Sequence, residues 1–155
     1  MKKNIKDYTL EDLKQEFINN NEKAYRAGQV YEWLYKENVT KFEEMTNLSI
    51  ALRSKLEENY SMGCYKILKK QLSKDGTIKY LFDVGDGNAI ETVRMEYKHG
   101  ASLCVSSQIG CKMGCKFCAS TGIAFVRSLT AGEIVEQILA VQRDTQKRIS
   151  NVVFM

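Results

Sequence analysis

Apolar residues recur at helical spacing through the first sixty residues of the chain. Thr9 can cap a first helix, because Asp12 stands at the third helical position and reaches back to it. The apolar face of this helix comprises Leu10, Leu13, Phe17 and Ile18. Two more amphipathic segments follow, at about residues 22–37 and 50–56. Residues 1–60 are therefore predicted to form a compact helical module.

From Tyr65 onward the apolar pattern changes to short β-rich runs. Asp75-Gly76 and the segment 85–88 separate these runs, and both are strong hairpin signals. The three predicted strands are 65–72, 77–84 and 89–97. Together they predict a small three-stranded antiparallel meander within residues 61–100.

One βαβ unit is predicted in the last part of the chain. Residues 102–107 and 152–155 read as strands, and a capping box at Thr130 and Glu133 opens the helix between them. The two strands should be parallel and joined right-handed, and parallel sheets carry their sites at the carboxyl ends of strands. A full β/α barrel needs about 250 residues. We therefore expect residues 101–155 to begin a barrel and the chain to be an N-terminal fragment.

The predicted fold class is thus α+β. A helical module and a small antiparallel sheet come first, and the first βαβ unit of a partial (β/α) barrel follows them.

Three cysteines with a C-x3-C-x2-C spacing follow the strand 102–107. They are Cys111, Cys115 and Cys118, on a loop in which Gly110 and Gly114 let the backbone wrap a small inorganic centre. Four-iron clusters usually take four thiolates, so three local cysteines leave one iron open to a non-protein ligand. The spacing therefore predicts a [4Fe-4S] centre that takes part in chemistry.

The cysteines also allow a zinc site or a disulfide framework. A structural zinc site needs a fourth ligand, and Cys104, Cys64 and His99 all stand at unusual spacings. The amino-terminal residues lack the apolar core of a signal peptide, so the thiols are expected to stay reduced in the cytoplasm. Cys64 matches no motif and is interpreted as structural.

Composition and charge change this picture little. The 155 residues, 44% of them hydrophobic, suffice for one ordinary domain or two small ones, and no transmembrane run is present. A net charge of +4 is compatible with a nucleic-acid partner but also occurs in proteins that bind none.

The helical module offers basic and aromatic side chains to a nucleic acid, and we expect it to be an accessory RNA-binding module. Tyrosines could stack on bases, although charges on helices are usually solvated and aromatics at helical spacing are usually core. The residues concerned are Lys3, Lys14, Lys23, Arg26, Lys36, Lys41 and Arg53, with Tyr25, Tyr31 and Tyr35.

The cysteine motif, with Phe117 before its last cysteine, resembles that of the radical S-adenosylmethionine superfamily. The flanking sequence resembles one family within it, the RNA adenine-C2 methyltransferases that act on both 23S rRNA and tRNA. A relative that methylates C8 shares much of the pattern. The matching segments are 45–49, 73–80, 90–93, 103–111 and 129–137.

This resemblance implies an activity that spacing alone does not indicate. One S-adenosylmethionine methylates an enzyme cysteine, and a second is cleaved reductively to a radical that activates the methyl group. The carbon radical then adds to the electron-poor C2 of an adenine in 23S rRNA, or of the adenosine next to the anticodon in tRNA. The implied partners are these RNAs and a flavodoxin- or ferredoxin-type reductant, with no membrane.

The resemblance also assigns roles to residues of this chain. Cys111, Cys115 and Cys118 match the cluster ligands. Glu91 matches the proposed proton acceptor, and Cys104 matches the cysteine that resolves the enzyme–RNA adduct and pairs transiently with the methyl-carrying cysteine.

Two features limit this resemblance. The methyl-carrying cysteine and a segment that contacts S-adenosylmethionine would lie beyond Met155, so the chain alone is expected to be inactive. Ser128, where the family pattern has asparagine, and residues 120–126 depart from the commonest pattern.

From its place in the strand, the Glu91 side chain is expected to face away from both Ile90 and Val93.

Overall fold

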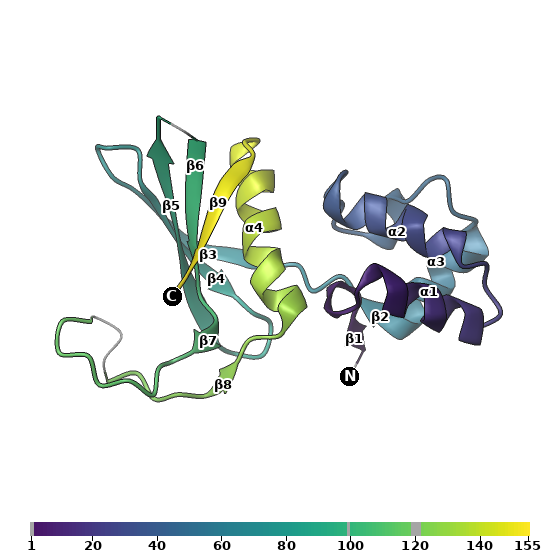
Figure 1. Ribbon diagram of the computed structural model, residues 1–155, viewed down its shortest axis with the longest axis horizontal. Coiled ribbons are helices and arrows are strands. Elements are labelled where there is room, and N and C mark those ends of the chain that lie inside the picture. Colours follow the sequence, from purple (N-terminus) through teal and green to yellow (C-terminus); the bar gives the residue numbers. More distant parts are fainter. Residues whose placement is uncertain (1, 99, 119–121) are drawn as a thin grey trace. The chain divides into compact units, whose positions relative to one another are not determined.

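The computed structural model describes residues 2–98, 100–118 and 122–155 (Figure 1). The chain forms two compact units, Met1–Cys64 and Tyr65–Met155, hereafter unit 1 and unit 2. His99 and Ser120, which the sequence analysis considered, lie outside the described residues. The predicted division into 1–60, 61–100 and 101–155 stays a prediction.

Unit 1 contains the predicted helices. They are α1 (Leu10–Asn19), α2 (Tyr25–Tyr35) and α3 (Ile50–Asn59), with 3-10 turns at Ile5–Asp7 and Phe42–Glu44. A two-residue strand β1 (Lys3–Asn4) pairs in parallel with β2 (Tyr60–Ser61). Helix α2 begins later than predicted, because the chain turns through Asn21 at a positive φ of 58° and Ala24 offers no side-chain cap.

The sequence explains why these helices form and pack. The predicted capping box is present in α1: the Thr9 side chain accepts a hydrogen bond from the Asp12 N–H, and the Asp12 carboxylate accepts one from the Thr9 N–H. Ser49 caps α3 in the same position. The apolar faces meet in one core, which includes Leu13, Phe17, Ala27, Val30, Leu34, Phe42, Met45, Leu52 and Leu56.

Unit 2 is built on one five-stranded sheet in the order β3-β4-β5-β6-β9. Its strands are β3 (Lys66–Leu72), β4 (Ile78–Asp83), β5 (Ala89–Tyr97), β6 (Gly100–Val105) and β9 (Ile149–Phe154). Strands β3 to β6 are antiparallel to their neighbours, whereas β6 and β9 are parallel. Helix α4 (Ala131–Thr145) connects β6 to β9. The predicted meander and βαβ unit are therefore both present, and they share a single sheet.

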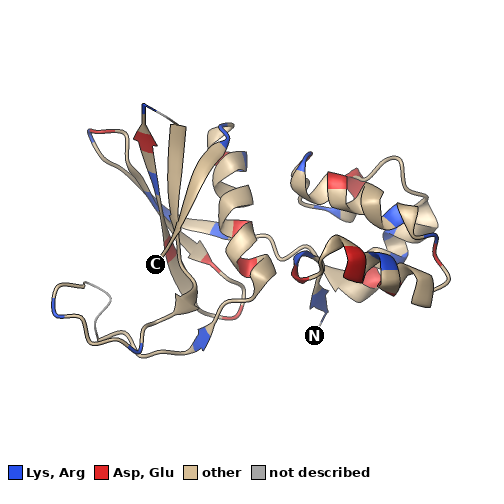
Figure 2. Cartoon of the chain, viewed as in Figure 1, with Lys and Arg blue, Asp and Glu red and all other residues tan. Residues whose placement is uncertain are grey.

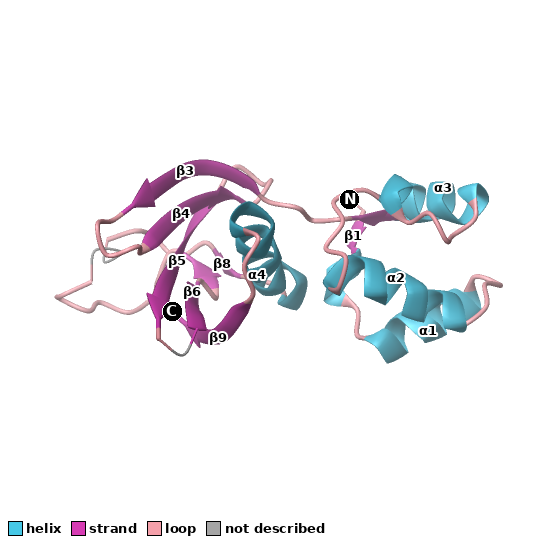
Figure 3. Ribbon diagram, turned by 90° about the horizontal axis from the view of Figure 1, so that it is seen from above, coloured by secondary structure: helices cyan, strands magenta, loops and turns pink. Residues whose placement is uncertain are grey.

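Helix α4 covers one face of this sheet (Figure 3). On that face lie the buried residues of alternate strand positions, among them Tyr80, Phe82, Leu103 and Val105, which pack with Val141 of the helix. Among the described residues of unit 2, α4 is the one helix. We call the opposite face the open face of the sheet.

The predicted fold class is confirmed, but one orientation within it was wrong. Glu91 faces away from Ile90, as expected, whereas Val93 is two residues further along β5 and shares the face of Glu91. Ile90 is buried under α4, and Val93 is only partly covered on the open face. Within the described residues, no helix combines the length and the apolar character that crossing a membrane requires.

Candidate radical-cofactor site

The cysteine loop is closed at its base by a short ladder. Strand β7 (Gln108–Ile109) precedes the loop and pairs antiparallel with β8 (Arg127–Ser128), which follows it. The Val126 N–H donates to the carbonyl of Ile109 at 2.9 Å, which continues the ladder into the loop. The loop therefore leaves the sheet just after β6, at the carboxyl end of a parallel strand, where the sequence predicted a site.

Gly110 is essential to the start of this loop, whereas Gly114 is not. Gly110 has a φ of 68°, and a Cβ atom there would lie 2.0 Å from the carbonyl oxygen of Ala124. The opposing backbone therefore passes where any other side chain would begin. At Gly114 no atom lies within 4 Å of such a Cβ. The predicted need for glycine thus has a structural cause at one of the two positions.

The three cysteines of the motif lie on this loop with partly or fully exposed side chains. The Cys111 sulfur accepts hydrogen bonds from Nε2 of Gln108 and from the Met113 N–H, each at 3.4 Å. The Cys118 N–H donates to the carbonyl of Cys115 at 3.1 Å. The five cysteines of the chain, all within the described residues, form no disulfide.

The donor set fits an iron–sulfur cluster better than zinc. Three thiols stand within eight residues on an accessible loop, and a four-iron cluster bound by three cysteines keeps one iron open. A closed structural zinc site needs a fourth ligand. Within the part of the chain that the structure describes, no three His, Cys, Asp or Glu side chains gather around one point, so the loop carries the three thiols without bringing them together at a metal ion.

Arg127 fixes the end of the cysteine loop to two other parts of unit 2. Its guanidinium donates to both carboxylate oxygens of Glu133, at 2.7 and 2.8 Å, and to Oδ2 of Asp86 at 2.7 Å. Glu133 opens α4 and Asp86 lies in the β4–β5 turn, so one side chain joins three elements. Figure 2 shows a basic segment on β8 and acidic segments on α4. The sequence alone does not indicate this role, because Arg127 and Asp86 are 41 residues apart.

This clamp changes the titration of its carboxyl groups. The hydrogen bond from Arg127 lowers the pKa of Asp86. Burial by itself would raise the pKa of Glu133, but the bonds from Arg127 and from Thr130 outweigh it, and the pKa is lowered. Both carboxyl groups are therefore held ionised.

Glu91 and Cys104 lie on the same open face of the sheet. Cys104 is directly opposite Val93 in the β5–β6 ladder, and Glu91 is two residues from Val93 along the same strand. The two side chains are thus diagonal neighbours, a relation that separates residues by about 7–8 Å. The family resemblance assigns a role to each residue separately, and the register of β5 and β6 brings the two together.

A buried glutamine on the α4 side of the sheet fixes the backbone beside this pair. Gln137 of α4 is completely buried, accepts hydrogen bonds from Thr92 Oγ1 at 2.7 Å and from the Ser106 N–H at 2.8 Å, and donates to the Ser106 carbonyl. The Ser106 hydroxyl in turn donates to the Glu91 carbonyl at 2.6 Å. Gln137 therefore fixes the end of β6, from which the cysteine loop departs.

The chain is similar in sequence to known proteins over almost its whole length. The family model of the ribosomal RNA large subunit methyltransferase N-terminal domain matches residues 3–62. The probable dual-specificity RNA methyltransferase RlmN of Clostridium botulinum (strain Loch Maree) is 50% identical over 98% of this chain, and that of Clostridium perfringens (strain SM101) is 53% identical over 99%. The chain is therefore similar to RlmN proteins over nearly its whole length.

A solved structure agrees with this relationship. A radical SAM methyltransferase from Sphaerobacter thermophilus superimposes with a TM-score of 0.88 at 34% identity over 97% of this chain. The chain spans 45% of that protein and 44–45% of the two clostridial RlmN relatives.

The RlmN N-terminal match coincides with unit 1, in which three tyrosines of α2 differ in exposure. Tyr31 and Tyr35 are half-buried against the core, with ring centroids 4.5 Å apart, and Tyr25 is 54% exposed. All three line a shallow hollow on α2 that also includes Gly28. A Cβ atom at Gly28 would meet nothing within 4 Å, so packing does not require glycine there.

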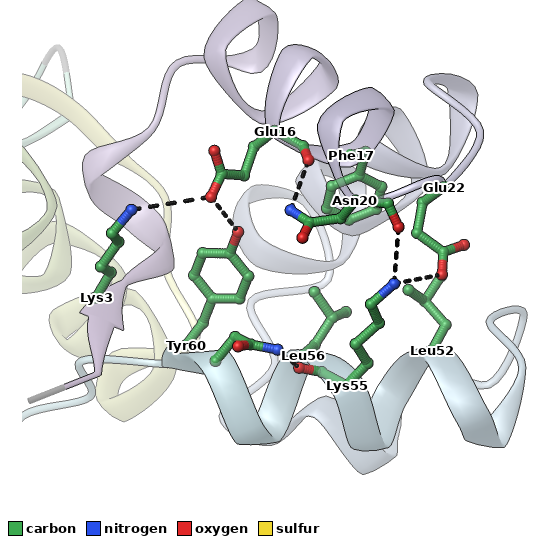
Figure 4. Close-up of a pocket in the computed structure, with 10 residues that line it drawn as sticks. Lys3, Glu16, Phe17, Asn20, Glu22, Leu52, Lys55, Leu56 and Tyr60 are labelled. Carbon is green, nitrogen blue, oxygen red and sulfur yellow. Dashed lines mark hydrogen bonds and ion pairs between the residues drawn. The ribbon is translucent and has the colours of Figure 1, made fainter.

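A second hollow of unit 1, between α1 and α3, has a cavity volume of about 250 Å³ (Figure 4). Its charged side chains bind other groups of the hollow: Glu16 accepts from the Tyr60 hydroxyl at 3.3 Å, and Lys55 lies 3.1 Å from Glu22. Burial and the Glu16 charge raise the pKa of Tyr60. These pairs connect α1 to β2, and α3 to the turn between α1 and α2.

Cys64 ends unit 1 and lies 3.8 Å from the Lys6 ammonium. It forms no disulfide, which leaves its predicted structural role a prediction.

Proposed function

We propose that this chain forms part of an RNA methyltransferase that methylates C2 of adenine in 23S rRNA and in tRNA by a radical S-adenosylmethionine mechanism. The observation that carries the proposal is the 50% sequence identity with an RlmN protein over 98% of the chain. The matched length includes the loop with the cysteine motif. When bound, the [4Fe-4S] cluster supplies the electron that cleaves S-adenosylmethionine.

In this proposal Cys111, Cys115 and Cys118 hold the cluster. Gly110 lets the loop close on itself, and Arg127 holds its far end against the β4–β5 turn and α4. These residues keep the cysteines at the carboxyl end of β6. The substrate is proposed to approach the sheet from that end.

Glu91 and Cys104 act on the substrate from the open face. Glu91 carries an exposed carboxylate that can accept the proton from C2 of the adenine. Cys104 is the thiol that resolves the enzyme–RNA adduct. Their position on one face supports a shared role, since a single bound nucleotide can contact both.

Unit 1 contributes to RNA binding in this proposal. The hollow lined by Tyr25, Tyr31 and Tyr35 offers aromatic surface for an unstacked base. The cytoplasm is the predicted location, because the reaction needs reduced thiols and an electron donor of the flavodoxin or ferredoxin type.

Anaerobic reconstitution with iron and sulfide tests the cluster. About four irons per chain are expected, with the absorbance band and electron paramagnetic resonance signal of a [4Fe-4S] cluster, and all should be lost in Cys115→Ala. Zinc bound at one equivalent without iron would contradict the proposal and favour a zinc-stabilised RNA-binding module.

Regiochemistry is tested on cellular RNA. Deletion of the gene should remove 2-methyladenosine from 23S rRNA and tRNA, as measured by mass spectrometry of nucleosides. Loss of 8-methyladenosine would instead assign the chain to the C8-methylating relatives, and unchanged methyladenosines would refute both activities.

A further inference from the structure

The excess positive charge of this chain lies entirely in unit 2. Residues 1–64 carry 10 Lys and Arg against 11 Asp and Glu, whereas residues 65–155 carry 13 against 8. Four of those 13 cations stand on β3 and the turn after it: Lys66, Lys69, Lys70 and Lys74. The helical unit, which sequence reasoning favoured for RNA contact, is therefore slightly acidic overall.

The lysines of β3 face opposite sides of the sheet. Lys70 is directly opposite Tyr80 on the α4 side, where its ammonium lies 2.5 Å from Asp144. Lys66 and Lys69 are opposite Asp83 and Leu81, which point to the open face. The charge of Lys70 is thus neutralised by α4. The described residues provide no ion pair within 4.0 Å for Lys66 or Lys69.

Lys79 continues this basic row toward the site. It lies on β4, two residues from Leu81, and therefore also on the open face, where its ammonium is 3.0 Å from Glu91. We call Lys66, Lys69 and Lys79 the lysine strip. It runs from the free edge of the sheet to the residue proposed as the proton acceptor.

Protection of an edge strand does not account for the whole strip. Lysines on an exposed edge discourage pairing with another sheet, and this suffices for Lys66 and Lys69 taken alone. Lys79, however, is on an inner strand that is paired on both sides. A row of cations that crosses from the edge to the second strand has the geometry of a contact for a polyanion.

We propose that the lysine strip binds the phosphate backbone of the RNA and brings its adenine to the open face beside Glu91. This inference rests on the proposed function for the identity of the substrate. Its own support is the charge complementarity between a phosphate chain and Lys66 and Lys69, which have no ion pair among the described residues. Lys79, already paired with Glu91, makes the strip continuous with the face that carries Glu91 and Cys104.

The test compares two neighbouring lysines on opposite faces. A fluorescein-labelled RNA hairpin with adenines in its loop is titrated with the chain, and binding is followed by fluorescence anisotropy between about 50 and 200 mM salt. The double variant Lys66→Gln/Lys69→Gln should bind about tenfold more weakly at low salt, with a salt slope smaller by roughly 1.5, because two phosphate contacts are lost.

Lys70→Gln is the matched control. It removes the same charge from the adjacent position of β3, and its affinity should stay within about twofold of wild type, since Asp144 already neutralises Lys70. Equal weakening in both variants would show that net charge alone matters and would overturn the inference. So would an unchanged affinity in the double variant, or a wild-type chain that does not bind the hairpin.

Sedimentation of the wild type and the double variant examines a different occupant. A wild-type dimer that dissociates in the double variant would assign the strip to self-association and overturn RNA binding there.

The iron content of the chain separates a failure of this inference from a failure of the proposed function. A chain that binds four irons but shows no effect of the double variant refutes the strip alone, and a chain without iron refutes the radical mechanism.

Discussion

The Nζ atom of Lys79 lies 3.0 Å from Oε1 of Glu91, across neighbouring strands on the open face of the sheet. Both side chains are about half exposed, at 45% and 50%. A solvated pair of this kind contributes at most about 1 kcal/mol to stability. Its significance is therefore positional: the strand register puts Glu91 on the face that also carries Cys104, and the ammonium orients the carboxylate there.

We predict that Glu91→Gln in the chromosomal gene abolishes 2-methyladenosine formation. The amide has nearly the same shape as the carboxylate but cannot accept the proton from C2. Mass spectrometry of nucleosides measures the loss, and a denaturing gel should show protein covalently joined to RNA. Asp83→Asn is the control, because Asp83 is a carboxylate on the same face. Normal methylation in Glu91→Gln would rule out its role as the base.

Lys79→Met should lower methylation several-fold without abolishing it. The proton acceptor remains, but the cation that orients it is lost. Because the pair is solvated, the melting temperature should change by less than about 5 °C. Lys79→Arg should restore most of the activity, since it keeps the charge. Equal activity in Met and Arg variants would show that Lys79 does not position Glu91.

The local signals in the sequence predicted most of the fold. Thr9 with Asp12, and Thr130 with Glu133, form the capping boxes that the sequence indicated, and the Gly76 and Gly85–Asn88 turns separate the strands as expected. Such signals act over three or four residues, so they can be read without knowledge of the rest of the fold.

Long-range relations could not be predicted in this way. Nothing local indicates that β5 pairs with β6, and that pairing puts Glu91 beside Cys104 and joins the meander to the βαβ unit. Arg127 joins Asp86 to Glu133 for the same reason: its partners become neighbours only through the sheet. The cysteine spacing was readable because its three thiols lie within eight residues.

Gly110→Ala should prevent normal cluster assembly, whereas Gly114→Ala should not. The new methyl group at position 110 would lie 2.0 Å from the Ala124 carbonyl, at a φ of 68°, so the loop must move. At position 114 the space is open. Iron content and the absorbance band after reconstitution measure the difference. Comparable iron loading in both variants would contradict the loop geometry.

Gly28→Ala should stabilise unit 1 by about 0.5–1 kcal/mol, because glycine in a helix is less favourable than alanine and the site is open. Gly76→Ala is the opposite case. The space there is also open, but φ is 85°, so alanine should destabilise unit 2 by about 1 kcal/mol. Urea unfolding followed by Trp33 fluorescence reports on unit 1, and amide hydrogen exchange of the β3, β4 and β5 strands reports on unit 2. Equal signs for the two variants would contradict this reasoning.

Arg127→Gln should destabilise unit 2 at neutral pH by roughly 1 kcal/mol, because the Arg127 side chain is 34% exposed and binds two carboxylates. The loss should depend on pH in a definite direction. The pKa values of Asp86 and Glu133 are lowered in the folded chain, from ordinary values of 3.8 and 4.5. Their contribution is therefore fully present above about pH 4.5 and declines as the pH falls through the lowered values.

The wild type and Arg127→Gln should consequently differ in urea midpoint at pH 7 and converge in acid. Protonated carboxyl groups no longer attract the guanidinium, so the clamp gives wild type no advantage once both groups are neutral. Arg148→Gln is a suitable control, because Arg148 is exposed and has no ion pair within the described part of the chain. Its midpoint should follow wild type at every pH. A difference between wild type and Arg127→Gln that persisted unchanged at about pH 2 would show that Arg127 stabilises the loop by packing and not by charge.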